Sequence, residues 1–219
     1  RVVFNRREND QTSLYVKDLA TETEKRVLEG ISSLMGWMPG GKKVLYYTPS
    51  PNLVFRLVDV DTGHVSDVGL EHPEYRSVAL RYSPRGDWLA FALVLDACAG
   101  ESRIHVARVE NRQPLEHSQW VEITSGGRRD VHPWWSPDGN TIYFLSDRDE
   151  FACIWAQPLD PATKRPKGPL KVLRHLHGRQ RFGPAAPAWF GYAMTADALY
   201  FPAYESRGNI WLAEPEPTE

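Results

Sequence analysis

PWWSPDGNTIYFLSDRDEFACIWAQPLD, from Pro133 to Asp160, is the stretch that decides the fold. It contains an aromatic pair, a Ser-Pro-Asp-Gly turn, an apolar run, a charged tip and a second apolar run. In this turn proline presets φ near about −65°, aspartate can hydrogen-bond its own backbone, and glycine tolerates positive φ. The turn therefore predicts a hairpin whose second strand is TIYFLS.

Copies of this unit recur along the chain. They are WMPGGKKVLYY from Trp37, YSPRGDWLAFA from Tyr82 and a decayed YAMTADALYFP from Tyr192. From Trp37 through Tyr82 and Trp135 to Tyr192, the aromatic leaders are 45, 53 and 57 residues apart. These are the periods of propeller blades with loop insertions. A fifth copy, RVVFNRRENDQTSLYVKDLATET, opens the chain and lacks its own aromatic leader and turn.

The repeats predict an all-β fold, a β-propeller of four-stranded antiparallel blades with four to five blades in this chain. We expect a single domain, 1–219, divided into a partial blade (1–30), three blades (31–75, 76–128 and 129–181) and a second partial blade (182–219). Because the chain begins inside one repeat and ends inside another, ring closure stays open. Exposed blade edges would favour pairing with a second copy. The segment ATETEKRVLEG from Ala20 fits a short helix or an outer strand equally well.

Composition excludes several classes of protein. The 219 residues are 42% hydrophobic and 25% charged, with a formal net charge of −2, which is typical of a globular domain and gives no electrostatic argument for nucleic acid or an anionic membrane. No apolar run reaches the about 18 residues of a membrane span. Cys98 and Cys153 are too few for a disulfide framework, and we expect two free thiols. The opening RVVF suggests a piece of a longer protein.

Catalytic motifs are missing from the sequence. It contains no Gly-x-Ser-x-Gly elbow, no glycine-rich phosphate loop, no His-Arg-Asp or Asp-Phe-Gly and no His-Glu-x-x-His. We therefore predict that this chain is not an enzyme and has no cofactor. The tip Asp147, Asp149 and Glu150 could bind calcium, but its arginine favours a solvated turn. His175 and His177 have a spacing that can ligate zinc or copper, but no third ligand is identifiable nearby, so no metal site is predicted.

Three segments lead into innermost strands and would surround one mouth of the central channel. They are EHPEYRS from Glu71, GGRRDVHP from Gly126 and HGRQRFGPAAP from His177. Their arginines, tyrosine and histidine would favour a protein, peptide or small anionic ligand, whereas the alternative is an ordinary surface. The candidate ligand-binding residues are Tyr75, Arg76, Arg128, Arg129, Asp130, His132, Trp134, Arg179 and Arg181.

Tryptophans fall into two groups. Trp37, Trp135, Trp155 and Trp211 occupy repeated positions, so packing between blades explains them. Trp134 and Trp189 depart from this pattern, and we expect them on the channel side.

The aromatic leader, Ser-Pro-Asp-Gly, the apolar strand, Ser-Asp-Arg-Asp and Ile-Trp together resemble the TolB-like β-propeller repeat, a relative of the WD repeats. The resemblance is strongest from Trp135 to Asp160 and extends over nearly the whole chain. DRDEFACIWAQPLDPATKRP and the final GNIWLAE are most similar to the C-terminal sensor-like propellers of bacterial serine/threonine protein kinases. Similar propellers are fused to winged-helix regulators and prolyl-oligopeptidase-type hydrolases.

In those architectures the propeller binds a ligand or partner while another domain performs the chemistry. The resemblance therefore implies a non-catalytic sensor or interaction module of a larger bacterial protein, located outside the cytoplasmic membrane. A cytoplasmic location stays open. The alternative is an accessory propeller that gates access to a peptidase.

Overall fold

The computed structural model describes residues 1–31, 33–48, 54–96, 100–125, 129–176, 180–181, 193–195, 198–200 and 204–205. Antiparallel strands and turns dominate this part of the chain, and its only helix is the single 3-10 turn η1 (His117–Gln119). The predicted all-β class is confirmed. No helix in these ranges is long and apolar enough to cross a membrane.

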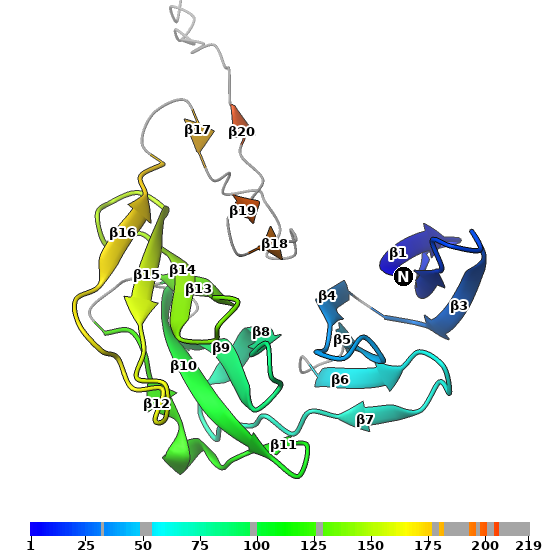
Figure 1. Ribbon diagram of the computed structural model, residues 1–219, viewed down its shortest axis with the longest axis horizontal. Helices are drawn as coiled ribbons and strands as arrows, with labels where there is room; N and C mark the ends of the chain where they lie inside the picture. The colour runs from blue at the N-terminus through cyan, green and yellow to red at the C-terminus, as the bar shows by residue number, and fades with distance from the viewer. Residues whose placement is uncertain are drawn as a thin grey trace, which may run out of the picture.

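Four sheets follow one another along the chain, and each keeps its main strands in sequence order (Figure 1). The first contains β1 (Val2–Glu8), β2 (Gln11–Lys17) and β3 (Glu24–Glu29). The second contains β4 (Ser33–Trp37), β5 (Lys43–Thr48), β6 (Val54–Asp59) and β7 (Val65–Asp67). The third contains β8 (Arg76–Tyr82), β9 (Trp88–Asp96), β10 (Glu101–Glu110) and β11 (Gln113–Pro114), with β12 (Val121–Glu122) also paired to β10. The fourth contains β13 (Asp130–Trp135), β14 (Thr141–Ser146), β15 (Cys153–Pro158) and β16 (Lys171–Arg174).

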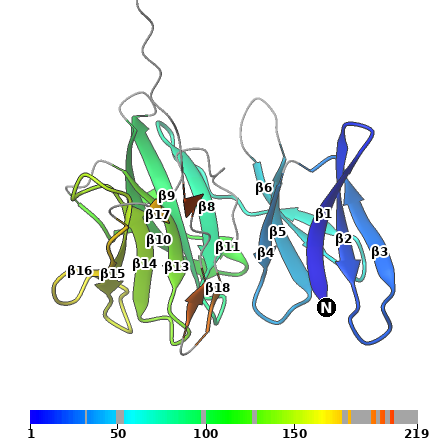
Figure 2. The same cartoon turned by 90° about the horizontal axis from the view of Figure 1, so that it is seen from above.

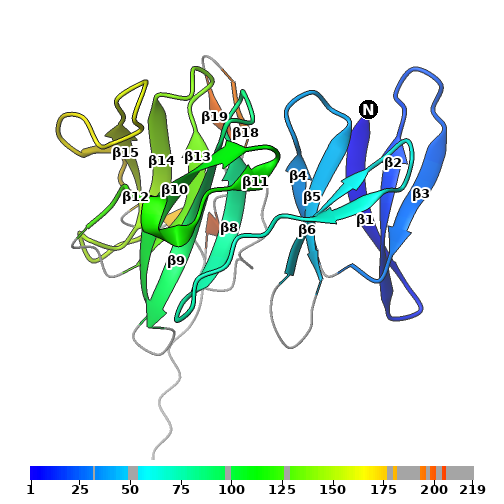
Figure 3. The same ribbon diagram turned by 90° about the horizontal axis from the view of Figure 1, so that it is seen from below.

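The sheets stand around an arc. In Figure 1 the strands β4, β8 and β13 lie toward the inside of the arc, and β3, β7 and β16 lie toward the outside. Figures 2 and 3 show the sheets side by side with their faces turned toward one another. Two short pairs follow, β17 (Gln180–Arg181) with β20 (Tyr204–Glu205) and β18 (Ala193–Met194) with β19 (Leu199–Tyr200). This is the arrangement of blades in an incomplete β-propeller.

The Ser-Pro-x-Gly turns join the two innermost strands of a sheet, as the sequence predicts. The amide of Gly139 donates to the carbonyl of Ser136 at 2.9 Å, and that of Gly86 donates to the carbonyl of Ser83 at 2.9 Å. Both glycines have positive φ, +72° and +76°, where a side chain would be strained. The Asp138 carboxylate accepts the amide two residues further on at 3.0 Å. Local chemistry alone therefore specifies these hairpins.

A second turn recurs at the outer side of three sheets, with the sequence Asp-x-x-Thr. The Oδ1 atoms of Asp18, Asp59 and Asp160 accept the amides two and three residues further on, at distances from 2.8 to 3.2 Å. These backbone hydrogen bonds lower the pKa of all three carboxyl groups. The first of these turns leads into β3, so the segment from Ala20 contributes an outer strand rather than a helix.

The core lies between the sheets, and the strand β9 shows why. Its side chains alternate between two apolar clusters, as the pleat of a strand requires. Leu89 and Phe91 pack with residues of the second sheet, whereas Ala90 and Ala92 pack with residues of the fourth. All four are 0% exposed. The third sheet is therefore buried on both faces.

The neighbouring central strands follow the same rule. In β5, Val44 and Tyr46 face the first sheet, and Leu45 and Tyr47 face the third. In β14, the side chain of Phe144 packs between the third and fourth sheets, while the side chain of Leu145 belongs to a cluster on the far face.

Packing between sheets is confirmed for three of the repeated tryptophans. Trp37 lies against the cluster between the first two sheets, and Trp135 and Trp155 belong to the cluster between the third and fourth. Trp211 and Trp189 lie outside the described residues.

Replacing Leu89 by alanine tests the dependence on packing between sheets. Because the side chain is 0% exposed between two sheets, Leu89→Ala is expected to lower the free energy of unfolding by about 2 to 5 kcal/mol. Urea unfolding followed by circular dichroism measures this change. Leu19→Ala is the matched control, since Leu19 is 63% exposed, and should change stability by less than about 0.5 kcal/mol. Equal effects of the two substitutions would contradict the packing described here.

Candidate functional site

The predicted ligand site begins where the chain enters β8. The half-buried Tyr75 packs against the core between the second and third sheets, and its ring lies on that of His72 with centroids 4.9 Å apart. Arg76 is exposed and lines a cavity of about 540 Å³. Three carboxylates line the same cavity, those of Asp67, Glu71 and Glu74. Negative groups outnumber positive ones here, which does not favour an anionic ligand at this cavity.

Asp130 begins the strand β13 and is 0% exposed. The Nη2 atom of Arg148 donates to both of its carboxylate oxygens, at 2.9 and 3.0 Å. The same guanidinium lies over the rings of Phe144 and Trp155, 5.4 and 5.2 Å from their centroids. Ser102 Oγ donates to the Asp130 carbonyl at 2.9 Å and so joins the third sheet to the fourth. Asp130 therefore has a structural role: its carboxylate binds Arg148 within the fourth sheet, and its carbonyl links this sheet to the third.

Arg129 precedes this ion pair and is exposed. Its amide donates to the Oδ1 atom of Asp147 at 2.9 Å. Asp147, one of the carboxylates considered above as a calcium ligand, therefore binds the backbone at the end of the fourth sheet.

His132 occupies an irregular part of β13, where the register with β14 shifts between Val131 and Trp134. Its φ is +55°. Ala79 occupies the equivalent position in the previous blade, three residues before the aromatic leader, and has φ +56°. Bulges of this kind bend innermost strands and redirect side chains. Burial, together with the positive charges of Arg81 and Arg129, lowers the pKa of His132 to about 4. The ring is neutral at pH 7.

Trp134 is buried rather than exposed on the channel side. It is 6% exposed and packs with Leu145, Ile154 and Leu176. The expectation failed because the face of the fourth sheet opposite Trp135 is itself covered by apolar side chains, so the side chain that points there is buried.

The remaining predicted residues are only partly placed. Arg181 lies in β17, where its backbone pairs with Tyr204, and Arg128 and Arg179 lie outside the described residues. The structure thus groups Arg129, Asp130, His132 and Trp134 along β13. In the described part of the chain, none of these four lines the cavity beside Tyr75 and Arg76.

A larger cleft, which sequence analysis missed, opens between the second and third sheets. We call it the inter-sheet cleft; it has a volume of about 1010 Å³ and lies at the turns that follow β4 and β8. Its apolar lining comes from Met38, Leu57, Tyr82 and Val109. Because four separate turns form its rim, no local pattern in the sequence marks it.

Positive charge predominates in the inter-sheet cleft. Its cations are Lys42, Lys43, Arg85 and Arg112, and none of the four has an ion pair within the part of the chain that the structure describes. Its two carboxylates are already engaged by their own turns. Asp59 accepts the hydroxyl of Thr62 at 3.0 Å, and Asp87 accepts that of Ser83 at 2.7 Å.

Tyr82 adds a buried hydroxyl to the same cleft. Among the described residues this hydroxyl has no hydrogen-bond partner. Burial raises the pKa of the phenol to about 12, so it remains protonated and able to donate. Leaving a polar group buried in this condition costs stability.

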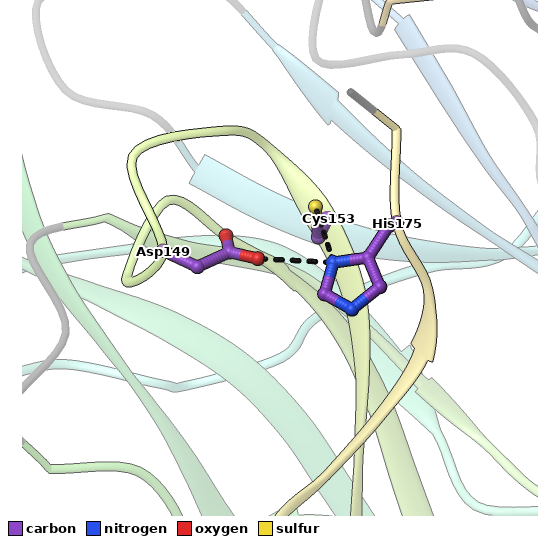
Figure 4. Close-up of side chains that lie close together, drawn as sticks. All are labelled: Asp149, Cys153 and His175. Atoms are coloured by element: carbon purple, nitrogen blue, oxygen red, sulfur yellow. Dashed lines mark hydrogen bonds and ion pairs between the residues drawn. The ribbon is translucent and has the colours of Figure 1, made fainter. Parts of the chain in front are cut away.

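Three potential metal ligands from different segments also meet in the fourth sheet. They are Asp149, Cys153 and His175 (Figure 4). The sequence marks His175 as a possible ligand but gives no sign that Cys153 lies beside it.

Neither a protein-family model nor a curated protein matches the sequence. Among solved structures, TolB from Acinetobacter baumannii has a TM-score of 0.57 and 18% identity, over 78% of this chain and 40% of that one. A putative TolB from Agrobacterium tumefaciens has a TM-score of 0.57 and 23% identity, over 78% and 60%. A puromycin-hydrolyzing peptidase from Mycobacterium tuberculosis has a TM-score of 0.56 and 15% identity, over 90% and 34%.

The chain thus has a TolB-like propeller fold. It spans between 40% and 60% of the length of the two TolB structures.

The lowered pKa of His132 predicts a pH dependence of stability. Above about pH 6.5 the His132 ring is neutral in both the folded and the unfolded state. As the pH falls toward about 4, the ring is protonated in the unfolded state but remains neutral in the folded state. Stability should therefore fall in this window by up to about 3 kcal/mol. Asparagine tolerates positive φ, so His132→Asn should remove this pH-dependent part of the free energy of unfolding. Urea unfolding measured across the pH range tests this. Parallel stability curves for the two proteins would contradict the burial of a neutral ring.

Proposed function

We propose that this chain is a non-catalytic binding module, and that its ligand is an acidic peptide segment of a partner protein held in the inter-sheet cleft. The observation that carries the proposal is the combination of an apolar floor with four cations that form no ion pair with the described residues. Ligand-binding pockets commonly have volumes of about 300 to 1,000 Å³, and a few convergent polar groups set their specificity.

The chemistry of the cleft favours a peptide with both acidic and apolar side chains. The cations at the rim would attract carboxylates, while Met38 and Leu57 offer apolar surface to a side chain between them. A neutral polar peptide would gain neither electrostatic attraction nor apolar contact.

At a finer level, we propose a sensor propeller in a larger bacterial protein such as a serine/threonine kinase, located outside the cytoplasmic membrane. This proposal is supported by the resemblance of the DRDEFACIWAQPLDPATKRP and GNIWLAE segments to kinase-associated propellers.

The second candidate function is that of an accessory propeller of a peptidase. The fold similarity to the puromycin-hydrolyzing peptidase is compatible with this role. The flanking gene sequence separates them: a kinase domain supports the first, and a Gly-x-Ser-x-Gly hydrolase domain supports the second.

Fluorescence polarisation with a labelled peptide tests the binding site. The probe is Glu-Phe-Asp-Leu-Glu, and Gln-Phe-Asn-Leu-Gln is its uncharged counterpart. We expect only the acidic peptide to bind, and binding should weaken as salt screens the rim charges. The double substitution Lys43→Gln and Arg85→Gln should weaken binding by about tenfold or more.

The matched control is Lys167→Gln with Lys171→Gln, which removes one exposed lysine from the connection between β15 and β16 and another from β16. This variant should bind as the unmodified chain does. Equal binding of both peptides, or equal loss in both double variants, would overturn the inter-sheet cleft as an acidic-peptide site.

A further inference from the structure

Asp149, Cys153 and His175 converge at one end of the fourth sheet. Asp149 lies in the turn between β14 and β15, Cys153 is the first residue of β15, and His175 follows the last residue of β16. Figure 4 shows the carboxylate and the sulfur both directed at the same ring nitrogen. The Nδ1 atom of His175 lies 3.2 Å from Asp149 Oδ2 and 3.8 Å from Cys153 Sγ.

These separations fit the edges of a tetrahedral metal site. With zinc bond lengths of about 2.3 Å to sulfur, 2.05 Å to nitrogen and 2.0 Å to oxygen, tetrahedral geometry places sulfur and nitrogen about 3.6 Å apart and nitrogen and oxygen about 3.3 Å apart. All three potential ligand atoms lie within 4.8 Å of one another. A single ion between them would contact each.

The surrounding fold holds the sulfur in place. Cys153 is 0% exposed, and the amide of Leu176 donates to its Sγ atom at 3.3 Å. Leu176 is itself buried in the cluster with Trp134 and Ile154. A backbone amide directed at a cysteine sulfur is the type of outer contact that stabilises a metal-bound thiolate.

The geometry argues against a nucleophilic triad. In such a triad the acid and the nucleophile contact different nitrogens of the histidine, so that the ring can pass a proton between them. Here both approach Nδ1. That arrangement converges on one point, as ligands around an ion do.

We propose that Asp149, Cys153 and His175 form a site for Zn²⁺, with the fourth position taken by water or an external ligand. One sulfur, one imidazole nitrogen and one carboxylate oxygen form a mixed set that suits zinc and gives little affinity for magnesium or calcium. The His175 side chain is 54% exposed, so the fourth position is accessible from solvent. The site lies apart from the inter-sheet cleft and does not depend on peptide binding there.

Zinc binding should release a proton. The metal ligand is the thiolate, so the Cys153 thiol must lose its proton when zinc binds. Zinc affinity is accordingly expected to increase with pH.

The test uses the untagged 219-residue chain after chelator treatment, titrated with zinc chloride against a chromophoric chelator. We expect one zinc ion per chain. Cobalt(II) in place of zinc should give a thiolate-to-metal charge-transfer band. Cys153→Ser should abolish this band, and His175→Gln, at an exposed position that leaves the core intact, should weaken zinc binding by more than about tenfold.

His117→Gln is the matched control because it removes an exposed histidine from η1, the helical turn between β11 and β12. It should bind zinc as the unmodified chain does. Circular dichroism establishes that each variant is folded. Three results would overturn the site: absence of zinc binding by the folded chain, undiminished binding by His175→Gln, or a cobalt complex without the charge-transfer band.

Discussion

The central strands β5, β9 and β14 present apolar side chains on both faces, and the rest of the structure depends on that constraint. A sheet with two apolar faces cannot be stable alone in water, because at least one face would remain exposed. In β9, Leu89 and Phe91 require the second sheet and Ala90 and Ala92 require the fourth. The repeats must therefore stack face to face around an axis, and the stability of one sheet depends on its neighbours.

This constraint also decides where binding can occur. The aromatic leaders and the apolar strands are occupied by packing, and the glycine and aspartate turns are occupied by their own hydrogen bonds. What remains are the spaces between turns of adjacent sheets and the sheet ends. The inter-sheet cleft is of the first kind, and the Asp149, Cys153 and His175 group is of the second. The cleft combines the aromatic leader Tyr82 with cations of the turns, and the second group combines side chains at one end of the fourth sheet.

The sequence was sufficient for the fold because its signals are local. Pro137 and Gly139 specify a turn within four residues, and alternation along β9 specifies two buried faces. The site depends on contacts between distant residues. Asp130 and Arg148 are 18 residues apart in the sequence, and Cys153 and His175 are 22 apart. The pairing of the strands brings the members of each pair into contact. The burial of Trp134 also depends on a distant residue, because Leu176 helps to cover its face of the sheet.

Amide hydrogen exchange resolved by residue tests the mutual dependence of the sheets most directly. The strands β8 to β10 lie in a sheet covered on both faces, whereas β3 and β16 lie at outer edges. We predict that amides of β9 exchange slowest and share one protection free energy with β5 and β14, since opening any of these sheets exposes its neighbours. Independent protection of the sheets, with β9 exchanging as fast as β3, would contradict the account.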